Sequence, residues 1–345
     1  MEPVAVAIDA MGGDHAPAEV VKGVMEFMTR NPDPRIYLVG KKREIRRELR
    51  RLPAGGMSER LSVINANDQI SMREQLLTYW RKRERTSIQR ALDLVRRGDA
   101  QAMVSAGNTG AVMALAKANL GMLEGIGRPA LATLIPTVKG KTMLMDVGAN
   151  VDSRPRHLVE FALMGKAFMQ TVHGIENPRI ALMSIGEEEG KGNELIKRTY
   201  AILKSMDINF IGNVEGRDAY LGESDLIITD GFTGNITLKV AEGVVDVVLS
   251  MIRSEMRSSL QSRLGVFLLK RSLRRLRRRL DYAEIGGALL LGINGIVVIG
   301  HGRSNAKAVG SALELSVRMV RERVLERISA EISGVRNVLE ELSYA

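Results

Sequence analysis

Six turns rich in glycine, asparagine and aspartate each follow a short apolar run, and this repetition constrains the fold most. They cover residues 9–15, 105–110, 146–152, 184–194, 230–235 and 300–305. Glycine lets the backbone approach a ligand closely, and Asn, Asp, Ser and Thr cap the helices that begin at such turns. The free N–H groups and the dipole of a helix N-terminus favour anions. We therefore expect one polar site, at the carboxyl ends of several strands, that receives an anion such as phosphate.

Length and composition indicate an ordinary globular protein. The chain has 345 residues, of which 45% are hydrophobic and 26% charged, enough for a substantial core. It contains no cysteine, which excludes disulfides, thiolate metal sites and an acyl intermediate on an enzyme cysteine. No signal peptide is recognisable, and the longest apolar stretch, 288–299, is shorter than the ~20 residues of a membrane span. We expect a cytoplasmic protein.

The net charge of +10 is concentrated in one segment. Residues 263–280 contain eight basic residues and no acidic ones, and leucines recur there with helical spacing. This predicts a basic amphipathic helical segment at 262–281, with candidate surface residues Arg271, Arg274, Arg275 and Arg278. In the purely structural interpretation, the segment is a solvated helix packed on its leucine stripe. In the functional interpretations, it binds an anionic membrane surface or an acidic protein. Nucleic acid ranks last because aromatic residues are not interleaved with the charges.

Short apolar runs alternate with amphipathic segments along the chain, which predicts an α/β fold with a largely parallel sheet and helices on both faces. Strands are expected at 4–9, 36–39, 61–64, 102–105, 131–135, 142–146, 180–185, 209–211, 226–229 and 296–299. Helices are expected at 16–29, 41–52, 87–97, 109–120, 158–172, 193–204, 235–261 and 304–332. Open parallel sheets bind ligands at the carboxyl ends of their strands. No domain boundary is visible, so we expect one domain over 1–345.

The turns supply candidate catalytic and binding residues. In the first turn, Asp14 is a candidate helix cap, and His15 beside it is a candidate acid, base or phosphate donor. His301 is a second candidate histidine. Lys191 lies between two glycines and is suited to reaching a ligand or to being a solvated loop lysine. Thr233 and Asn235 are candidate helix caps.

The remaining candidates share a place in these turns, where backbone N–H groups and polar side chains can hold an anion. They are Asp9, Gly12, Gly13, Asp14, Gly107, Asn108, Thr109, Gly110, Asn193, Asp230 and Gly231. A metal site built from Glu187, Glu188 and Glu189 is conceivable, but adjacent acids diverge in direction. We expect no metal and no organic cofactor.

Several of these motifs, in this order, resemble the PlsX family of phosphate acyltransferases from Val4 to about Lys307. The matching stretches are 9–17, 105–111, 146–152, 174–179, 185–194, 212–218, 230–235, 290–295 and 300–307. The chain departs from the family at 85–87, where Arg-Thr-Ser replaces Asp-Ser-Ser. Leu289 replaces a usual proline, Arg303 a serine and Ser153 a cysteine.

The resemblance implies transfer of a fatty acyl group from acyl carrier protein, which is acidic, to inorganic phosphate, giving acyl phosphate. It also implies a three-layer α/β/α fold similar to phosphotransacetylases and isocitrate dehydrogenase-like enzymes. A homodimer and peripheral membrane association are implied as well, because a membrane glycerol-phosphate acyltransferase takes the product. His15, Lys191 and Asn235 are the expected catalytic residues.

Two other functions remain open at this point. One is a dehydrogenase on the related fold, which the missing G-x-G-x-x-G fingerprint disfavours. The other is a scaffold at the membrane surface that uses only the basic segment, and it leaves the six polar turns unexplained.

Overall fold

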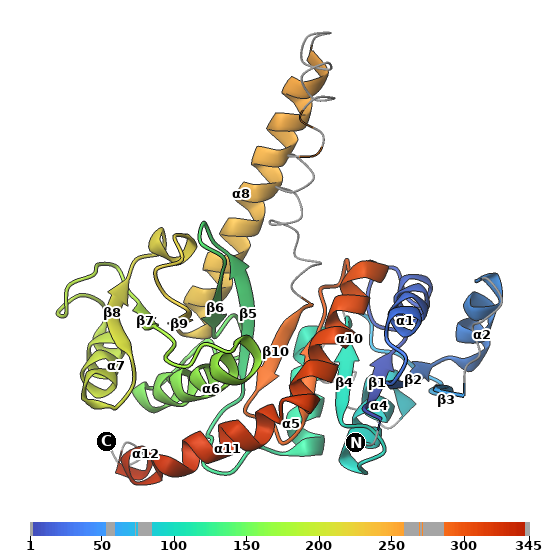
Figure 1. The fold of residues 1–345 in the computed structure, drawn as a ribbon, viewed down its shortest axis with the longest axis horizontal. Coiled ribbons are helices and arrows are strands. Elements are labelled where there is room, and N and C mark those ends of the chain that lie inside the picture. Colours follow the sequence, from blue (N-terminus) through green and yellow to red (C-terminus); the bar gives the residue numbers. More distant parts are fainter. Residues whose placement is uncertain are drawn as a thin grey trace.

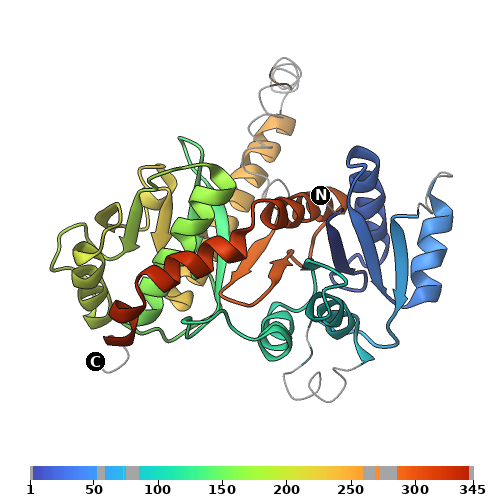
Figure 2. The same ribbon diagram turned by 60° about the horizontal axis from the view of Figure 1, so that its bottom comes forward.

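The computed structural model describes residues 3–52, 59–72, 74, 85–258, 269, 271 and 286–341. Its centre is an eleven-stranded sheet flanked by helices on both faces (Figure 1, Figure 2). In sheet order the strands are β3 (Leu61–Asn65), β2 (Arg35–Gly40), β1 (Ala5–Asp9), β4 (Ala102–Ser105), β11 (Ile296–Ile299), β10 (Ala288–Leu291), β5 (Ala130–Pro136), β6 (Lys141–Met145), β9 (Leu226–Ile228), β7 (Ile180–Met183) and β8 (Phe210–Val214).

The helices divide between the two faces because successive strand residues point to opposite sides. Val6 and Ile8 join one hydrophobic cluster, whereas Ala5 and Ala7 join the other. The first cluster packs α1 (Ala18–Arg30), α2 (Lys42–Arg51), α6 (Pro155–His173), α7 (Glu194–Ser205), α10 (Ala306–Arg321) and α11 (Val324–Gly334). The second packs α4 (Ser87–Arg96), α5 (Thr109–Leu120), the short helix η2 (Asp218–Tyr220) and the start of α8 (Gly231–Ser258). A final helix, α12, covers Arg336–Glu341. The predicted α/β/α layering is confirmed.

The direction of the strands changes in the middle of the sheet. β10 pairs antiparallel with β11 and β5, and β5 pairs antiparallel with β6, while the other neighbours are parallel. The sheet is mostly parallel, as predicted, but β6, β7, β8 and β9 run opposite to β1, β2, β3, β4 and β11. Residues 9–15, 105–110 and 300–305 therefore follow strands of one direction, and residues 146–152, 184–194 and 230–235 follow strands of the other.

Two expectations about the C-terminal part of the chain need correction. The predicted helix 304–332 is two helices, because Arg323 takes a left-handed backbone conformation with φ 55° between α10 and α11. The apolar run 288–299 contains β10 as well as β11, and Gly292, with φ 87°, lies in the turn between them. A sequence window reads these two short strands as one segment because both are apolar.

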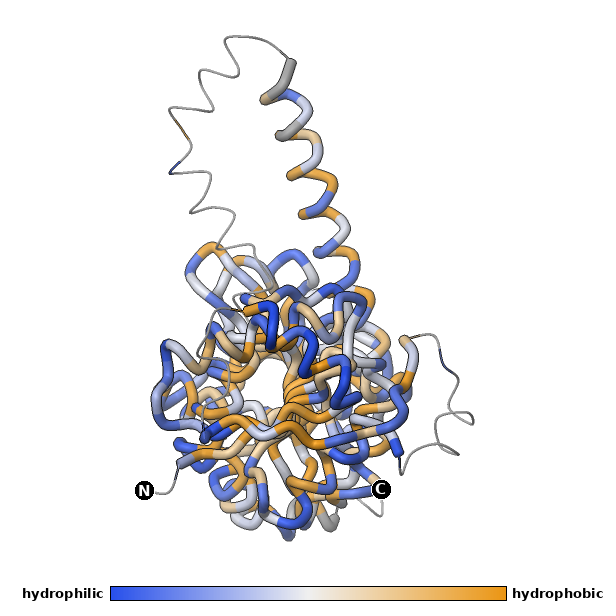
Figure 3. Tube along the Cα trace, turned by 90° about the vertical axis from the view of Figure 1, so that its right-hand side faces the viewer, coloured by the Kyte–Doolittle hydropathy of each residue, from blue (hydrophilic) through white to orange (hydrophobic). Residues whose placement is uncertain are grey.

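Helix α8 extends well beyond the body of the protein (Figure 1, Figure 3). Large apolar side chains are exposed along it: Phe232, Ile236, Val240, Val244, Val247, Val248 and Met251. Among the helices of the described residues, none is both long and apolar enough to cross a bilayer.

Candidate functional site

Three polar turns that follow the neighbouring parallel strands β1, β4 and β11 contact one another. The amide of Gly300 donates to the Ser105 carbonyl at 2.8 Å, and the amide of Asp14 donates to the Gly302 carbonyl at 2.8 Å. We call residues 9–15, 105–110 and 300–305 the first turn group. The structure thus brings together half of the predicted turns.

A buried carboxylate, that of Asp9, is hydrogen-bonded to residues of the first turn group. Asp9 is 2% exposed and accepts the Ser105 hydroxyl at 2.7 Å and the Met11 amide at 3.0 Å. The Ser105 hydroxyl in turn accepts the Gly107 amide at 3.1 Å. Burial raises the pKa of Asp9, and these hydrogen bonds oppose the rise. Asp9 therefore positions the turns and lies too deep to meet a substrate.

Two glycines of this group are required by close packing. A Cβ on Gly12 would lie 2.7 Å from both the Asp9 carboxylate and the Gly107 nitrogen. Gly13 has φ 103°, and a Cβ there would lie 3.1 Å from the Gly302 carbonyl oxygen. The backbone at Gly12 and Gly13 therefore packs directly against the backbone at Gly107 and Gly302.

Helix α5 begins inside the first turn group. Asn108 caps it by accepting the Ala111 amide at 3.0 Å, and its own amide group donates to the Met72 carbonyl at 3.0 Å. Asn108, and not Thr109, is therefore the cap of this helix. The N-terminus of α5, from Thr109 onward, presents free N–H groups and a positive dipole end at the turns. This is the strongest anion-binding feature of the group.

Asp14 and His15 are the two exposed residues of the first turn. Asp14 does not cap α1, which starts later, at Ala18, without a side-chain cap. The His15 carbonyl instead accepts the Glu19 amide at 3.2 Å. The imidazole of His15 is left at the surface beside the turns.

His301 is half-buried in the same group, and its surroundings define its tautomer. Its Nδ1 accepts the Arg303 amide at 3.2 Å, so the neutral ring carries its proton on Nε2. Burial lowers the pKa of His301; Glu242 opposes this, while Arg303 and Lys239 add to it. His301 is therefore a neutral N–H donor at physiological pH. Lys239 and Glu242 belong to α8, so charges of that helix act on the pKa of His301.

A second buried carboxylate organises the turn after β6. Asp146 accepts hydrogen bonds from the amides of Leu131, Gly148, Ala149 and Asn150, and from the Asn150 side chain, at 2.7–3.1 Å. Burial raises the pKa of Asp146, and these donors oppose the rise. We call residues 146–152 and 230–235 the second turn group, since α8 begins against this loop.

Glycine permits the contact between α8 and the loop. A Cβ on Gly234 would lie 1.9 Å from the Asp146 carbonyl oxygen, and one on Gly231 would lie 2.6 Å from the Asn150 carbonyl oxygen. Asp230 caps α8 by accepting the amide and the hydroxyl of Thr233, both at 2.8 Å.

Thr233 and Asn235 therefore lie inside α8, and their prediction as caps is wrong. The side chain of Asn235 is exposed and faces Gly148: its Cβ would lie 3.8 Å from a Cβ built on that glycine.

Lys191 lies in the loop between β7 and α7. Its side chain is exposed, its amide donates to the Glu188 carbonyl at 3.0 Å, and Asn193 caps α7 by accepting the Ile196 amide. Glu189 forms a 2.7 Å ion pair with Lys204. β7 runs opposite to β1 in the sheet, so Lys191 and His15 follow strands of different direction. That they act at one site stays a prediction. Within the described residues no three acidic or histidine side chains group as a metal site.

Several residues outside the two turn groups were not singled out by sequence analysis. Thr86, in the segment that departs from the family, caps α4 by accepting the Gln89 amide at 3.3 Å, and Arg85 pairs with Asp68 at 3.2 Å. Lys239 and Glu242 gave no signal because they lie within a long helix. Of the predicted basic surface, Arg271 is exposed, whereas Arg274, Arg275 and Arg278 lie outside the described residues.

The contact between Gly234 and the Asp146 carbonyl yields a test. Gly234→Ala should lower the free energy of unfolding by about 1–3 kcal/mol, because the methyl group displaces α8 from the loop. Gly243→Ala, in the same helix with nothing within 4 Å of its Cβ, should stabilise by about 0.5–1 kcal/mol. Urea denaturation followed by circular dichroism measures both. Equal effects of the two substitutions would contradict this packing.

Comparisons with known proteins agree with this geometry. The family described as "Fatty acid synthesis protein" matches residues 4–327. Phosphate acyltransferase from Carboxydothermus hydrogenoformans is 46% identical over 333 residues, covering 96% of this chain and 99% of the relative. The enzyme of that name from Heliobacterium modesticaldum is 47% identical over 329 residues, covering 95% and 98%.

Among solved structures, a phosphotransacetylase from Streptococcus pyogenes shares the fold with a TM-score of 0.64. It is 17% identical, and the match covers 92% of this chain and 94% of that one. The layered sheet, the glycine turns and the two relatives that match over almost their whole length lead to one assignment. The chain belongs to the phosphate acyltransferase family of fatty acid and phospholipid synthesis.

Proposed function

We propose that the protein transfers a fatty acyl group from acyl carrier protein to inorganic phosphate and so supplies acyl phosphate for phospholipid synthesis. The observation that most supports this proposal is the first turn group, in which α5 begins beside two glycine turns and which also contains the neutral His301. Such a helix end binds phosphate through backbone N–H groups. Membership of the phosphate acyltransferase family supports transfer of an acyl group to that phosphate.

In the proposed reaction a phosphate oxygen attacks the carbonyl carbon of the thioester. A C–O bond forms, the C–S bond breaks, and the carrier thiol leaves as a thiolate that takes up a proton. Phosphate is itself a nucleophile at neutral pH, so the reaction needs no metal or organic cofactor. Holding both reactants in attack geometry contributes roughly 7–11 kcal/mol. An acyl-serine route through Ser105 is disfavoured because that hydroxyl is buried and bonded to Asp9.

The proposed roles follow from exposure and donor chemistry. Amides at 12–15 and 107–110 hold phosphate, apart from those of Asp14 and Gly107, which donate within the fold, and Asn235 from the second turn group assists. His15 or Lys191 stabilises the oxyanion, and a donor of this kind is typically worth about 3–4 kcal/mol. The Nε2–H of neutral His301 donates a hydrogen bond to the leaving sulfur, and the thiolate takes its proton from water. Asn108 contributes as the cap of α5.

Trapping of acyl phosphate as its hydroxamate tests this function. Wild type with palmitoyl-acyl carrier protein should give hydroxamate only when phosphate is present. Lys191→Ala and His301→Ala should each lower the rate at least about tenfold, as expected for loss of one transition-state donor. Lys197→Gln, an exposed change on α7, is the control. Absence of product from folded wild type would contradict the reaction.

We also propose that the segment 262–281 places the protein on an anionic membrane, where a membrane glycerol-phosphate acyltransferase receives the product. Basic residues near such a surface contribute about 1 kcal/mol each. Glutamate at Arg274, Arg275, Arg277 and Arg278 together should abolish sedimentation with vesicles that contain phosphatidylglycerol. Unchanged sedimentation would overturn this assignment.

We further propose a homodimer that buries the apolar stripe of α8. The other long helix expected from the sequence, 304–332, has its apolar side chains in the core: Val309, Leu313, Val317 and Ile328 are buried. On α8, Val240, Val244 and Met251 share one exposed face. Val244→Glu should therefore shift sedimentation velocity toward the monomer, whereas Asp246→Lys, off the stripe, should not. A monomeric wild type would contradict the proposal.

A further inference from the structure

Helix α2 carries six basic residues on a polar surface far from the segment 262–281 in sequence. Two of them are neutralised locally: Arg47 and Arg51 pair with Glu48 at 3.3 Å and 2.9 Å. Glu48 itself is buried, as are the apolar residues Ile45 and Leu49. This side of α2 serves the packing of the helix.

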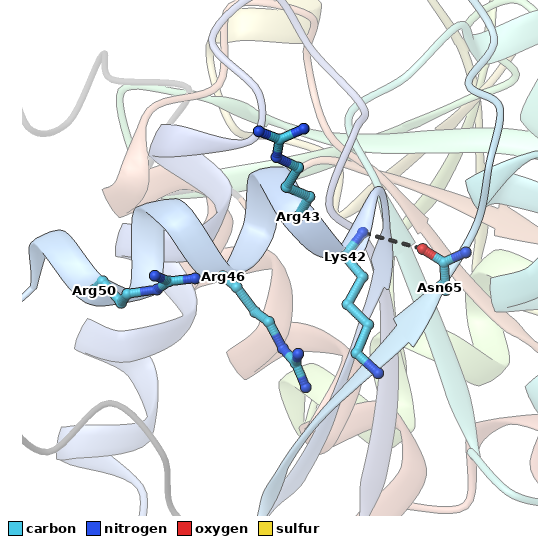
Figure 4. A pocket seen from close by; sticks show the side chains of 5 residues that line it. All are labelled: Lys42, Arg43, Arg46, Arg50 and Asn65. Carbon is cyan, nitrogen blue, oxygen red and sulfur yellow. Dashed lines mark hydrogen bonds between the residues drawn. The ribbon is translucent and has the colours of Figure 1, made fainter.

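The other four basic residues form a different surface. Lys42, Arg43, Arg46 and Arg50 are exposed, and within the described part of the chain none forms an ion pair with a carboxylate. Together with Asn65 they line an open hollow of about 620 Å³ (Figure 4). Asn65 accepts the amide of Lys42 at 3.2 Å, which fixes the start of α2 to the end of β3. We call these four residues the α2 stripe.

The α2 stripe is unfavourable for the helix that carries it. Lys42 and Arg46, and Arg46 and Arg50, are like charges four residues apart, a spacing that destabilises a helix by a few tenths of a kcal/mol per pair. Acidic residues on α2 are Glu44 and Glu48, and both pair elsewhere, with Lys41 and with Arg47 and Arg51. An acidic partner would supply the missing counter-charges.

The α2 stripe also lies on the same side as the first turn group. β1, β2 and β3 are parallel neighbours, so α2 starts at the carboxyl edge that carries residues 9–15. The Ala10 amide donates to the Val39 carbonyl at 2.8 Å, and a Cβ on Gly40 would lie 2.7 Å from Met11 Cγ. Strands are about 4.8 Å apart, so β3 is roughly 10 Å from β1. A partner bound at α2 is therefore close to the proposed phosphate site.

The chemistry of this surface favours a protein over a membrane or a nucleic acid. A helix that lies on a membrane inserts apolar side chains between the headgroups, but Ile45 and Leu49 of α2 face the core. Single-stranded nucleic acids stack on aromatic residues, and α2 and β3 contain none. An acidic protein surface needs only complementary charge.

We propose that the α2 stripe is the docking surface for the acidic carrier protein that presents the acyl thioester. This inference rests on the proposed function, which supplies the carrier-linked substrate. It separates two basic surfaces: the α2 stripe for the substrate protein and the segment 262–281 for the membrane.

Kinetics of Arg43→Gln/Arg46→Gln/Arg50→Gln test the docking surface. The KM for palmitoyl-acyl carrier protein should rise about tenfold, with kcat unchanged, since complementary charge acts on encounter and binding. The KM for palmitoyl-coenzyme A, which lacks the protein, should change less than twofold. The control Lys197→Gln/Arg198→Gln/Arg327→Gln removes three exposed charges elsewhere and should behave like wild type. Added salt should raise the wild-type KM more than that of the α2 variant.

Two results would overturn the docking surface while leaving the proposed function intact. One is an unchanged KM for the acylated carrier in the α2 variant. The other is loss of vesicle sedimentation in that variant with the KM unchanged, which would assign the stripe to the membrane. If wild type turned over neither substrate, the proposed function would fail instead. Fluorescence anisotropy with labelled carrier protein would then test the docking surface without turnover. Equal affinity of wild type and the α2 variant for the carrier protein would overturn the docking surface.

Discussion

The contact between α8 and the loop after β6 is the constraint on which the rest of the site depends. Asp146 accepts four hydrogen bonds from that loop and a fifth from Leu131 in β5, and Gly234 lets the first turn of α8 lie directly on the loop backbone. Lys239 and Glu242, further along α8, act on the pKa of His301 in the first turn group.

Buried carboxylates shape both turn groups without meeting the ligand. Asp9 and Asp146 each accept amide hydrogens from a glycine-containing turn, and burial raises the pKa of both. Their placement leaves helix ends and amides directed outward, which suits an anion. His301 is neutral and can donate a hydrogen bond through its Nε2–H without adding a fixed charge. In the proposed function the basic charge lies at the periphery, where it selects acidic partners.

The sequence was sufficient for the layers and for the individual turns, because strand alternation, glycine and capping residues are local signals. Asn108 and Asn193 cap helices that begin at two of these turns. The reversal at β10 and β5 was not predictable from these signals, since strand direction depends on pairing between distant segments. Lys239 and Glu242 became visible only once α8 had been placed against His301, and the unpaired basic residues of α2 only once Glu48 was seen to pair with their neighbours.

A crystal structure of the protein grown with inorganic phosphate tests the central claim most directly. The account predicts phosphate at the N-terminus of α5, hydrogen-bonded to amides of residues 107–110 and 12–15 and within reach of His301 Nε2. Phosphate bound instead beside Lys191 in the loop after β7, with the first turn group empty, would contradict the account.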